Sequence, residues 1–447
     1  MENKRSDQMK LGLFVNQGGH HEAAWRLSDT PCDAGLELAY YKKIACISEA
    51  CALHFLFFAD SAGVKQASAS EIARAAGNDG FEPLTLLAAL TGHTQSIGLV
   101  TTASTTFNSP YDLARKFASL DHLSGGRVGW NVVTSANPFE AQNFGSEPLP
   151  DHDERYQRAM EFVDVARGLW DSWGDDAFIR DKASGVFADT MKMHVLDHHG
   201  RFFTSRGPLN IARSPQGYPV LVQAGNSQAG LDFAAHFGEV IFTAERTVEG
   251  AQNIYRSIKD RAKKYGRPEN SIVVMPGVVP IVGKTEEEAH EKLRRLQDLT
   301  HPDIAIGVAN RLLGFVTDLK KFDMDAPMPS QLAATNNLQS RQKMLLELVA
   351  RERLTVRQFL NLVTVGRGHL LLVGSPQQIA DHLLKFFNAY AADGFNILPP
   401  VLPQGLQDFA EMVIPELRSR AAFRLAYEPG TLRDNLGLAR PSNQFGI

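Results

Sequence analysis

The chain has 447 residues, and its 46 Lys and Arg against 50 Asp and Glu give a formal net charge of −4. A chain of this length buries roughly 75% of its unfolded surface without a disulfide or metal, and its near-neutral charge excludes a long-range attraction to nucleic acid or to an anionic membrane. No apolar run approaches the roughly 20 residues of a membrane span, and residues 1–10 do not resemble a signal peptide, so we expect a cytoplasmic enzyme.

Strand-like and helix-like segments alternate from the start of the chain. Residues 10–16 (KLGLFVN) predict a strand, and apolar residues spaced three and four apart over 36–51 predict a helix. Residues 55–60 (FLFFAD) are typical of a strand buried on both faces of a parallel sheet. The pattern continues with strands over 97–104, 127–134, 219–224, 240–244, 272–282 and 395–402, and with helices over 83–94, 111–123, 154–173, 227–237, 251–265, 285–298, 376–392 and 408–420.

Eight strands, each followed by a helix, favour a TIM (β/α)8 barrel with insertions over an open doubly wound sheet. We expect one domain over residues 1–447, with insertions near 175–215 and 284–370 and a C-terminal arm near 425–447. Within the second insertion, residues 318–345 have little pattern and are interpreted as a lid.

The carboxyl ends of barrel strands form the active face, and one of them has the features of an anion site. Gly225-Asn226-Ser227 joins a buried strand to a helix, so backbone N–H groups and a hydroxyl meet where a phosphate is favoured. His152 and Tyr156 lie one helical turn apart at the start of another helix, where Asp151-x-x-Glu154 predicts a capping box. The spacing alone also fits an ordinary helix cap at Ser227 and a solvated His152.

Other strand ends carry polar residues with two possible interpretations. Asp60 ends an apolar strand as either a cap or a ligand-binding acid, whereas Thr106 alone fits a turn. Asn131 stands between apolar neighbours in a buried strand, where an amide needs a partner. His20 and His21 are adjacent, so they do not form the His-x-His metal site of barrel hydrolases. With three cysteines and no CxxC spacing, we predict no metal.

Taken in order, several segments resemble the bacterial-luciferase-like flavin monooxygenases. Within that family the resemblance is to the subgroup of nitrilotriacetate, EDTA, dibenzothiophene-sulfone and long-chain alkane monooxygenases. Residues 119–135 (SLDHLSGGRVGWNVVTS) are the most specific match. The others are 11–26 (LGLFVNQGGHHEAAWR), 58–60 (FAD), 102–111 (TASTTFNSPY), 152–156 (HDERY), 223–227 (QAGNS), 392–395 (ADGF) and 431–438 (TLRDNLGL).

The resemblance implies an oxygenase that uses O2 and reduced FMN (FMNH2), which a separate NAD(P)H-dependent flavin reductase supplies. By position, the isoalloxazine ring would lie against Asp60, Thr106 and Asn131. The phosphate would be held by His152, Tyr156 and Ser227, together with Gly225 and Asn226. A flavin C4a-hydroperoxide would oxidise the substrate, and His20 or His21 would donate a proton or hydrogen bond to it.

The resemblance does not choose the substrate, because residues 27–29 (LSD) replace a His-Pro of many relatives and 318–345 match poorly. An aminopolycarboxylate would need cations, with Arg26, Arg246 and Arg311 as candidates. An organosulfur compound or an alkyl chain would use Phe58, Phe107 and Phe315.

Three other functions stay open at this point: a non-catalytic flavin-binding barrel, a deazaflavin-dependent dehydrogenase of the same superfamily, and a metal-dependent barrel hydrolase. The resemblance also implies a homodimer or homotetramer, with the C-terminal residues 431–447 as an arm.

Overall fold

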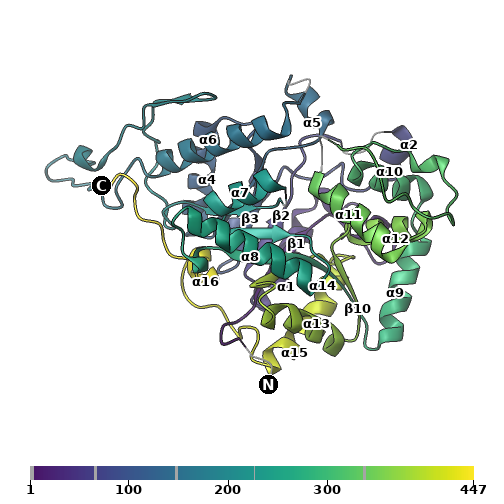
Figure 1. Ribbon diagram of the computed structural model, residues 1–447. Helices are drawn as coiled ribbons and strands as arrows, with labels where there is room; N and C mark the ends of the chain where they lie inside the picture. The colour runs from purple at the N-terminus through teal and green to yellow at the C-terminus, as the bar shows by residue number, and fades with distance from the viewer. Residues whose placement is uncertain (1–4, 65–67, 146–148, 226, 336–338) are drawn as a thin grey trace.

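Eight apolar segments form the parallel strands of a closed barrel in the computed structural model, which describes residues 5–64, 68–145, 149–225, 227–335 and 339–447 (Figure 1). Each strand pairs with the next, β8 pairs with β9, and β11 pairs with β1 to close the ring. The TIM barrel predicted from the sequence is therefore confirmed. The strands are β1 (Lys10–Val15), β2 (Phe55–Phe58), β3 (Gly98–Ser104), β4 (Val128–Val133), β7 (Val220–Gln223), β8 (Val240–Thr243), β9 (Val273–Val282) and β11 (Gly394–Ile397).

The barrel interior is a packed core. Inward-pointing side chains such as Phe55, Val100 and Met275 form one buried cluster. The ring of Phe55 fits only because Gly12 faces it, since a Cβ on Gly12 would lie 2.3 Å from Cε2 of that ring. Large and small residues thus alternate across the interior, as a filled barrel requires.

Helices follow the strands as predicted and pack around the barrel. Between α14 and α15 the chain forms a π-helical turn, Phe409–Val413, so the last predicted helix is three consecutive segments. The surrounding helices are α1 (Leu38–Ala50), α3 (Pro83–Thr91), α4 (Pro110–Ser124), α6 (His152–Trp170), α7 (Gln228–Phe237), α8 (Val248–Lys264), α9 (Glu286–Asp298), α13 (Pro376–Asn388), α14 (Gln404–Asp408) and α15 (Ile414–Ser419), with short α2 (Ala69–Ile72) and α5 (Pro138–Asn143). No helix in these described ranges is long and apolar enough to cross a membrane.

The segment between β9 and β11 contains elements that the sequence pattern did not reveal. Helices α10 (Pro302–Leu312), α11 (Gln339–Glu352) and α12 (Val356–Gly366) share a hydrophobic cluster of their own. Strand β10 (Leu370–Gly374) pairs with the second half of β9 outside the ring. Figure 1 shows these helices at the end of the barrel opposite α16. They therefore cover the mouth formed by the carboxyl ends of the strands.

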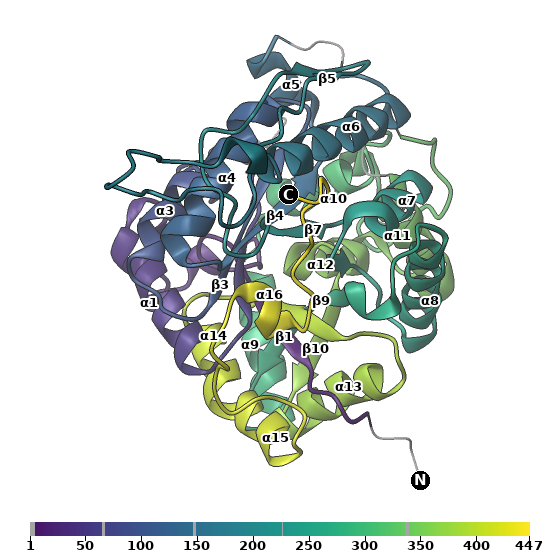
Figure 2. The ribbon, with the colours of Figure 1, turned by 90° about the vertical axis from the view of Figure 1, so that its left-hand side faces the viewer.

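The other end of the barrel is closed by α16 (Leu432–Leu436), which lies across it in Figure 2. Leu432 and Leu436 join the interior cluster of the barrel. Arg433 is buried and forms an ion pair with Glu239, and it also donates to the carbonyl of Tyr218. The C-terminal arm thus begins as a plug in its own barrel.

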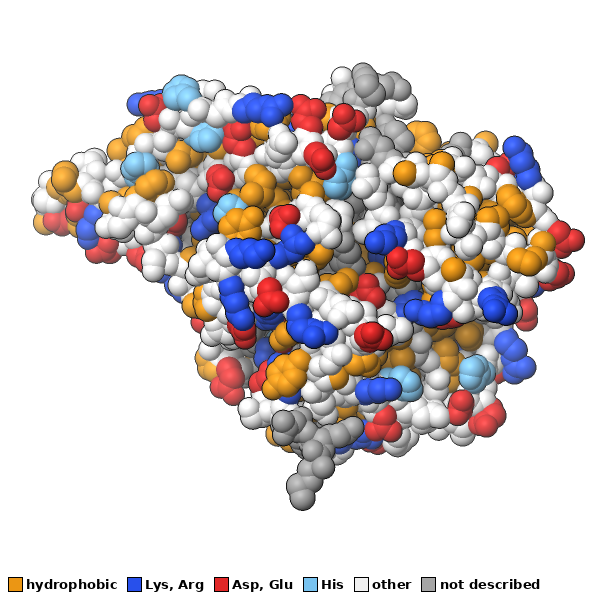
Figure 3. Space-filling model, in the orientation of Figure 1, with side chains coloured by type: hydrophobic (Ala, Val, Ile, Leu, Met, Phe, Trp, Pro, Cys, Tyr) orange, Lys and Arg blue, Asp and Glu red, His pale blue; other side chains and the backbone are white. Residues whose placement is uncertain are grey.

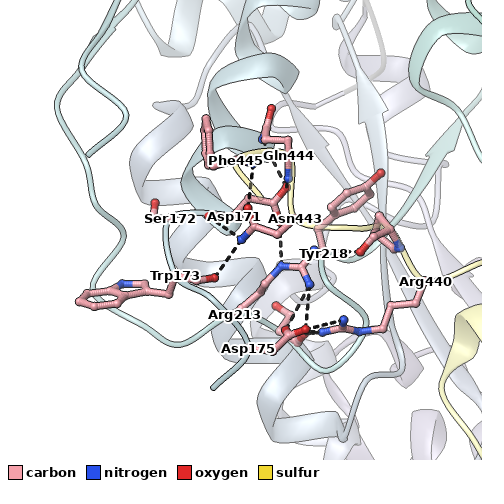
Figure 4. A network of polar contacts seen from close by, with 12 residues as sticks. Asp171, Ser172, Trp173, Asp175, Arg213, Tyr218, Arg440, Asn443, Gln444 and Phe445 are labelled. Carbon is pink, nitrogen blue, oxygen red and sulfur yellow. Dashed lines mark hydrogen bonds and ion pairs between the residues drawn. The ribbon is translucent and has the colours of Figure 1, made fainter. Parts of the chain in front are cut away.

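The rest of the arm is bound to the segment after α6 by the polar network in Figure 4. Asn443 donates to the carbonyl of Asp171 (2.9 Å), and Arg440 pairs with Asp175 (2.6 Å). Arg213 is buried and pairs with the carboxylate of Asp171 (2.8 Å). The described arm therefore lies along its own chain.

We predict that Glu239→Gln lowers the free energy of unfolding by about 3–5 kcal/mol, because the buried guanidinium of Arg433 loses its counter-charge. Urea denaturation followed by circular dichroism measures this change. Asp325→Asn, which removes the exposed partner of Arg357, is the control and should leave stability within error. An equally small change in Glu239→Gln would show that the α16 contact does not stabilise the barrel.

Candidate active site

Aromatic rings form the floor of the barrel mouth. The ring of Phe14 lies 4.8 Å from Phe57 and 5.9 Å from Phe242, and His20 packs edge-on against it at 4.5 Å. His369, just before β10, stacks on Phe242 at 5.1 Å. These rings separate the mouth from the barrel core, so a ligand there rests on an apolar surface.

A short chain of hydrogen bonds orients Asn131 beside this floor. The hydroxyl of Thr102 donates to the carbonyl of Phe58 (3.0 Å), so its oxygen accepts from Nδ2 of Asn131 (2.8 Å). The amide of Asn131 is thereby fixed, and its buried Oδ1 has no hydrogen-bond partner among the described residues. Oε1 of the buried Gln223 also has no hydrogen-bond partner among the described residues. Two amide oxygens near the ends of β4 and β7 are therefore available to accept from a ligand.

The described residues predicted for the anion site lie near the start of α7. Ser227 is the N-cap residue, and its Oγ accepts from the N–H of Gly230 (3.0 Å), which leaves its hydroxyl hydrogen for another partner. The hydroxyl of Tyr156 bonds to Ser227, and burial raises its pKa. The ring of His152 lies 4.9 Å from that of Tyr156. The structure thus brings these three predicted residues together, whereas Asn226 lies outside the described residues.

A cavity of about 220 Å³ connects these groups and is lined by His152, Tyr156, Gln223, Gly225 and Ser227, among others. Gly225 has a steric role, because a Cβ there would lie 2.6 Å from Nε2 of Gln223 and 3.1 Å from Oη of Tyr156. The cavity is therefore lined by hydroxyl and imidazole groups and by the amide of Gln223, which lies close to the hydroxyl of Tyr156.

The predicted capping box at the start of α6 is wrong. Asp151 is the N-cap residue, but its side chain forms no capping hydrogen bond. The residue is exposed, so water takes the place of a backbone partner.

Asp60 and Thr106 lie away from the phosphate end. Asp60 is exposed and lines a separate cavity of about 710 Å³, which meets the first at Val133 and Ser135. The hydroxyl of Thr106 donates to the carbonyl of Thr134 (2.7 Å), so only its oxygen is left for a ligand.

His20 and His21 line a third cavity, of about 40 Å³, beside the loop after β1. Nε2 of His20 bonds to the carbonyl of Phe14 (3.0 Å), which holds the ring at the floor. Burial lowers the pKa of His21 to about 4, so it is neutral at pH 7. Gly19 has a φ of +123° and would place a Cβ 2.3 Å from the carbonyl oxygen of Pro400, so only glycine lets the loop pass there.

The candidate substrate residues do not share one cavity. Arg26, Arg246 and Arg311 line three different cavities. Phe58 is buried on the helix side of the barrel, and Phe107 stacks on Phe144 at 4.7 Å. Phe315 is 41% exposed, so these three rings form no common apolar pocket.

Sequence reasoning missed four residues of the mouth, namely Gln223, Arg341, Arg367 and His369. Gln223 had a signal, because an amide ending a buried strand needs a partner. Arg341 donates to the carbonyl of Arg367 (3.1 Å), and its guanidinium lies 3.4 Å from Nε2 of His369. In the described part of the chain, no three His, Cys, Asp or Glu side chains gather as a metal site would require.

The sequence profile of the luciferase-like monooxygenases matches residues 12–393. The chain is 46% identical over 442 residues to N-acetyl-S-(2-succino)cysteine monooxygenase of Bacillus subtilis strain 168, and the alignment covers 99% of both. It is 45% identical over 443 residues to nitrilotriacetate monooxygenase component A of Aminobacter aminovorans, with 98% of both covered. The crystal structure of a riboflavin lyase with a modified FMN and riboflavin superposes with a TM-score of 0.87, at 34% identity over 97% of each chain.

A full-length match at this identity, together with the shared barrel, identifies the family that the sequence motifs predicted. The chain belongs to the luciferase-like monooxygenase family and is a flavin-dependent monooxygenase.

Proposed function

We propose that this chain is the oxygenase component of a two-component system, in which a separate NAD(P)H-dependent flavin reductase supplies reduced FMN and O2 oxidises a small organic substrate. The observation that carries this proposal is the cavity lined by His152, Tyr156, Ser227 and Gln223, which combines anion-binding groups with an amide oxygen that has no partner among the described residues. The name "component A" of the Aminobacter relative supports a second component.

The groups around the cavity fit FMN. A phosphate needs hydrogen-bond donors, and Ser227, Tyr156 and His152 provide them at a helix N-terminus. The reduced isoalloxazine ring carries N–H groups, which need acceptors such as Oδ1 of Asn131 and Oε1 of Gln223. The site therefore offers donors for the phosphate and acceptors for the N–H groups of the ring.

When bound, reduced FMN supplies the electrons that activate O2, and the protein controls the surroundings of that reaction. The rings of Phe14 and Phe242 exclude water from below. Both histidines line the small cavity beside the loop after β1, but of the two it is His20 that also packs against Phe14 of the aromatic floor. We therefore assign the proton-handling role beside the ring to His20.

The direct test is a reconstituted assay with a flavin reductase, NAD(P)H, FMN and 18O2. The candidate substrates are nitrilotriacetate and N-acetyl-S-(2-succino)cysteine, which the relatives' names give. We expect one 18O atom in the product of at least one of them, and only when the reductase is present. Peroxide release without substrate oxidation for every compound tried would favour a non-catalytic flavin-binding role.

Ser227→Ala should weaken binding of reduced FMN about tenfold, since a hydrogen bond to a charged phosphate contributes about 1.5–3 kcal/mol. Thr285→Ala is the matched control, because Thr285 caps α9 through the same bond and lines none of the cavities described above. Both variants should lose about 1 kcal/mol of stability. Anaerobic fluorescence titration measures the affinity, and equal affinities in the two variants would remove Ser227 from the phosphate site.

Asn131→Leu tests whether Asn131 acts in cofactor binding or only in the stability of the fold. It removes a buried oxygen that has no partner in the described protein, but also the hydrogen bond from Nδ2 to Thr102. These two effects offset each other, so the melting temperature of the flavin-free chain should change little. The affinity for reduced FMN should fall about tenfold, because the ring loses an acceptor. A lower melting temperature with unchanged affinity would make Asn131 a purely structural residue.

A further inference from the structure

The small cavity beside the β1 loop is lined by two arginines, two histidines and one carboxylate, besides other residues. It is lined by His21, Glu22, Arg311 and Arg367, among others. A second cavity of about 210 Å³ adjoins it, since both are lined by Glu22 and Trp25. Of the residues assigned above to the cofactor, His20 also lines the smaller cavity.

Arg311, on α10, is the main unexplained group of the smaller cavity. Its guanidinium makes no hydrogen bond within the described part of the chain. Its burial lowers its pKa, and the charges of Glu22 and Glu71 oppose that effect. Its neighbour Arg367 is already engaged, because it donates to Oε1 of Glu22 (3.2 Å). A guanidinium has five N–H donors, so those of Arg311 are available to donate hydrogen bonds to water or to a ligand.

His21 presents a second donor to the same space. Its Nδ1 accepts from the N–H of Ala23 (3.1 Å), so the neutral ring carries its hydrogen on Nε2. That nitrogen is buried and has no partner among the described residues, in a side chain that is only 2% exposed. A buried N–H donor without a protein acceptor needs a hydrogen bond to a ligand or to an ordered water.

The charge of the two cavities is strongly positive. Among the described residues that line them, Arg26, Arg74, Arg311 and Arg367 face one carboxylate, so the formal charge is 4 − 1 = +3. Burial opposes ionisation of Glu22, but Arg367 and Arg311 outweigh it and hold its pKa below the ordinary value. On the surface of the molecule, by contrast, acidic and basic side chains are mixed (Figure 3).

We propose that these two cavities form a substrate subsite for a di- or tricarboxylate, with one carboxylate held between Arg311 and Nε2 of His21. The proposal rests on the monooxygenase function above, and the link between the two sites is His20, which packs against the aromatic floor and also lines the smaller cavity. A planar carboxylate accepts two parallel bonds from a guanidinium, and 40 Å³ suits so small a group. A second carboxylate meets Arg26 and Arg74 in the adjoining cavity.

The test is isothermal titration calorimetry of the full, flavin-free chain with tricarballylate, a simple tricarboxylate. We expect saturable binding, and Arg311→Met should weaken it by about tenfold or more. This variant should lower the melting temperature only slightly, because Arg311 interacts with the charges of Glu22 and Glu71 but makes no hydrogen bond within the described protein, whereas the loss of a hydrogen-bonded structural arginine would lower it strongly. His21→Phe keeps a ring but removes the donor, and it should also weaken binding. Arg357→Met removes an exposed charge as the control and should bind like the wild type.

Three results would overturn the proposal: no binding by the wild type, equal binding by Arg311→Met, or equal binding of the uncharged tricarboxamide. Sulfate that competes as well as tricarballylate would show a site for free inorganic anions instead of substrate carboxylates. Because flavin is absent from the titration, failure here leaves the cofactor assignment intact. Conversely, if the chain bound tricarballylate but not reduced FMN, the result would contradict the proposed function and support the anion site.

Discussion

Closure of the parallel barrel is the constraint on which the rest of this structure depends. It brings eight strand carboxyl ends to one mouth, so polar residues from distant parts of the chain meet there. The opposite end is sealed by α16, whose Arg433 is paired with Glu239 beneath the strands. With one end sealed and α10 to α12 over the other, the chemistry is confined to the mouth.

Within the mouth, hydrogen-bond donors and acceptors are separated. Amide oxygens of Asn131 and Gln223 gather near the ends of β4 and β7, above an apolar floor. Hydrogen-bond donors stand at Ser227, at the start of α7, and at Arg311, on the inserted helix α10. The acceptors suit the N–H groups of a reduced flavin ring, and the donors suit a phosphate and an anionic substrate.

Local patterns in the sequence were enough to predict the barrel and part of the candidate site. Continuous apolar runs predicted all eight ring strands, and the cap at Ser227 followed from the residues next to one of them. Strand β10 was missed because its short apolar run pairs outside the ring. The capping box at Asp151 failed because the motif does not say whether a carboxylate faces solvent. The contact of Arg311 with the cavity of His21 depends on how α10 packs, which no local pattern encodes.

The measurement that tests the central claim most directly is an anaerobic titration of the purified wild-type chain with reduced FMN, followed by admission of O2. The account predicts a single saturable site per chain that prefers reduced FMN to riboflavin, because His152, Tyr156 and Ser227 recognise the phosphate. Oxygen should then react with the bound flavin along a course that differs from that of free reduced flavin. Absence of saturable binding, or equal affinity for riboflavin, would contradict the account.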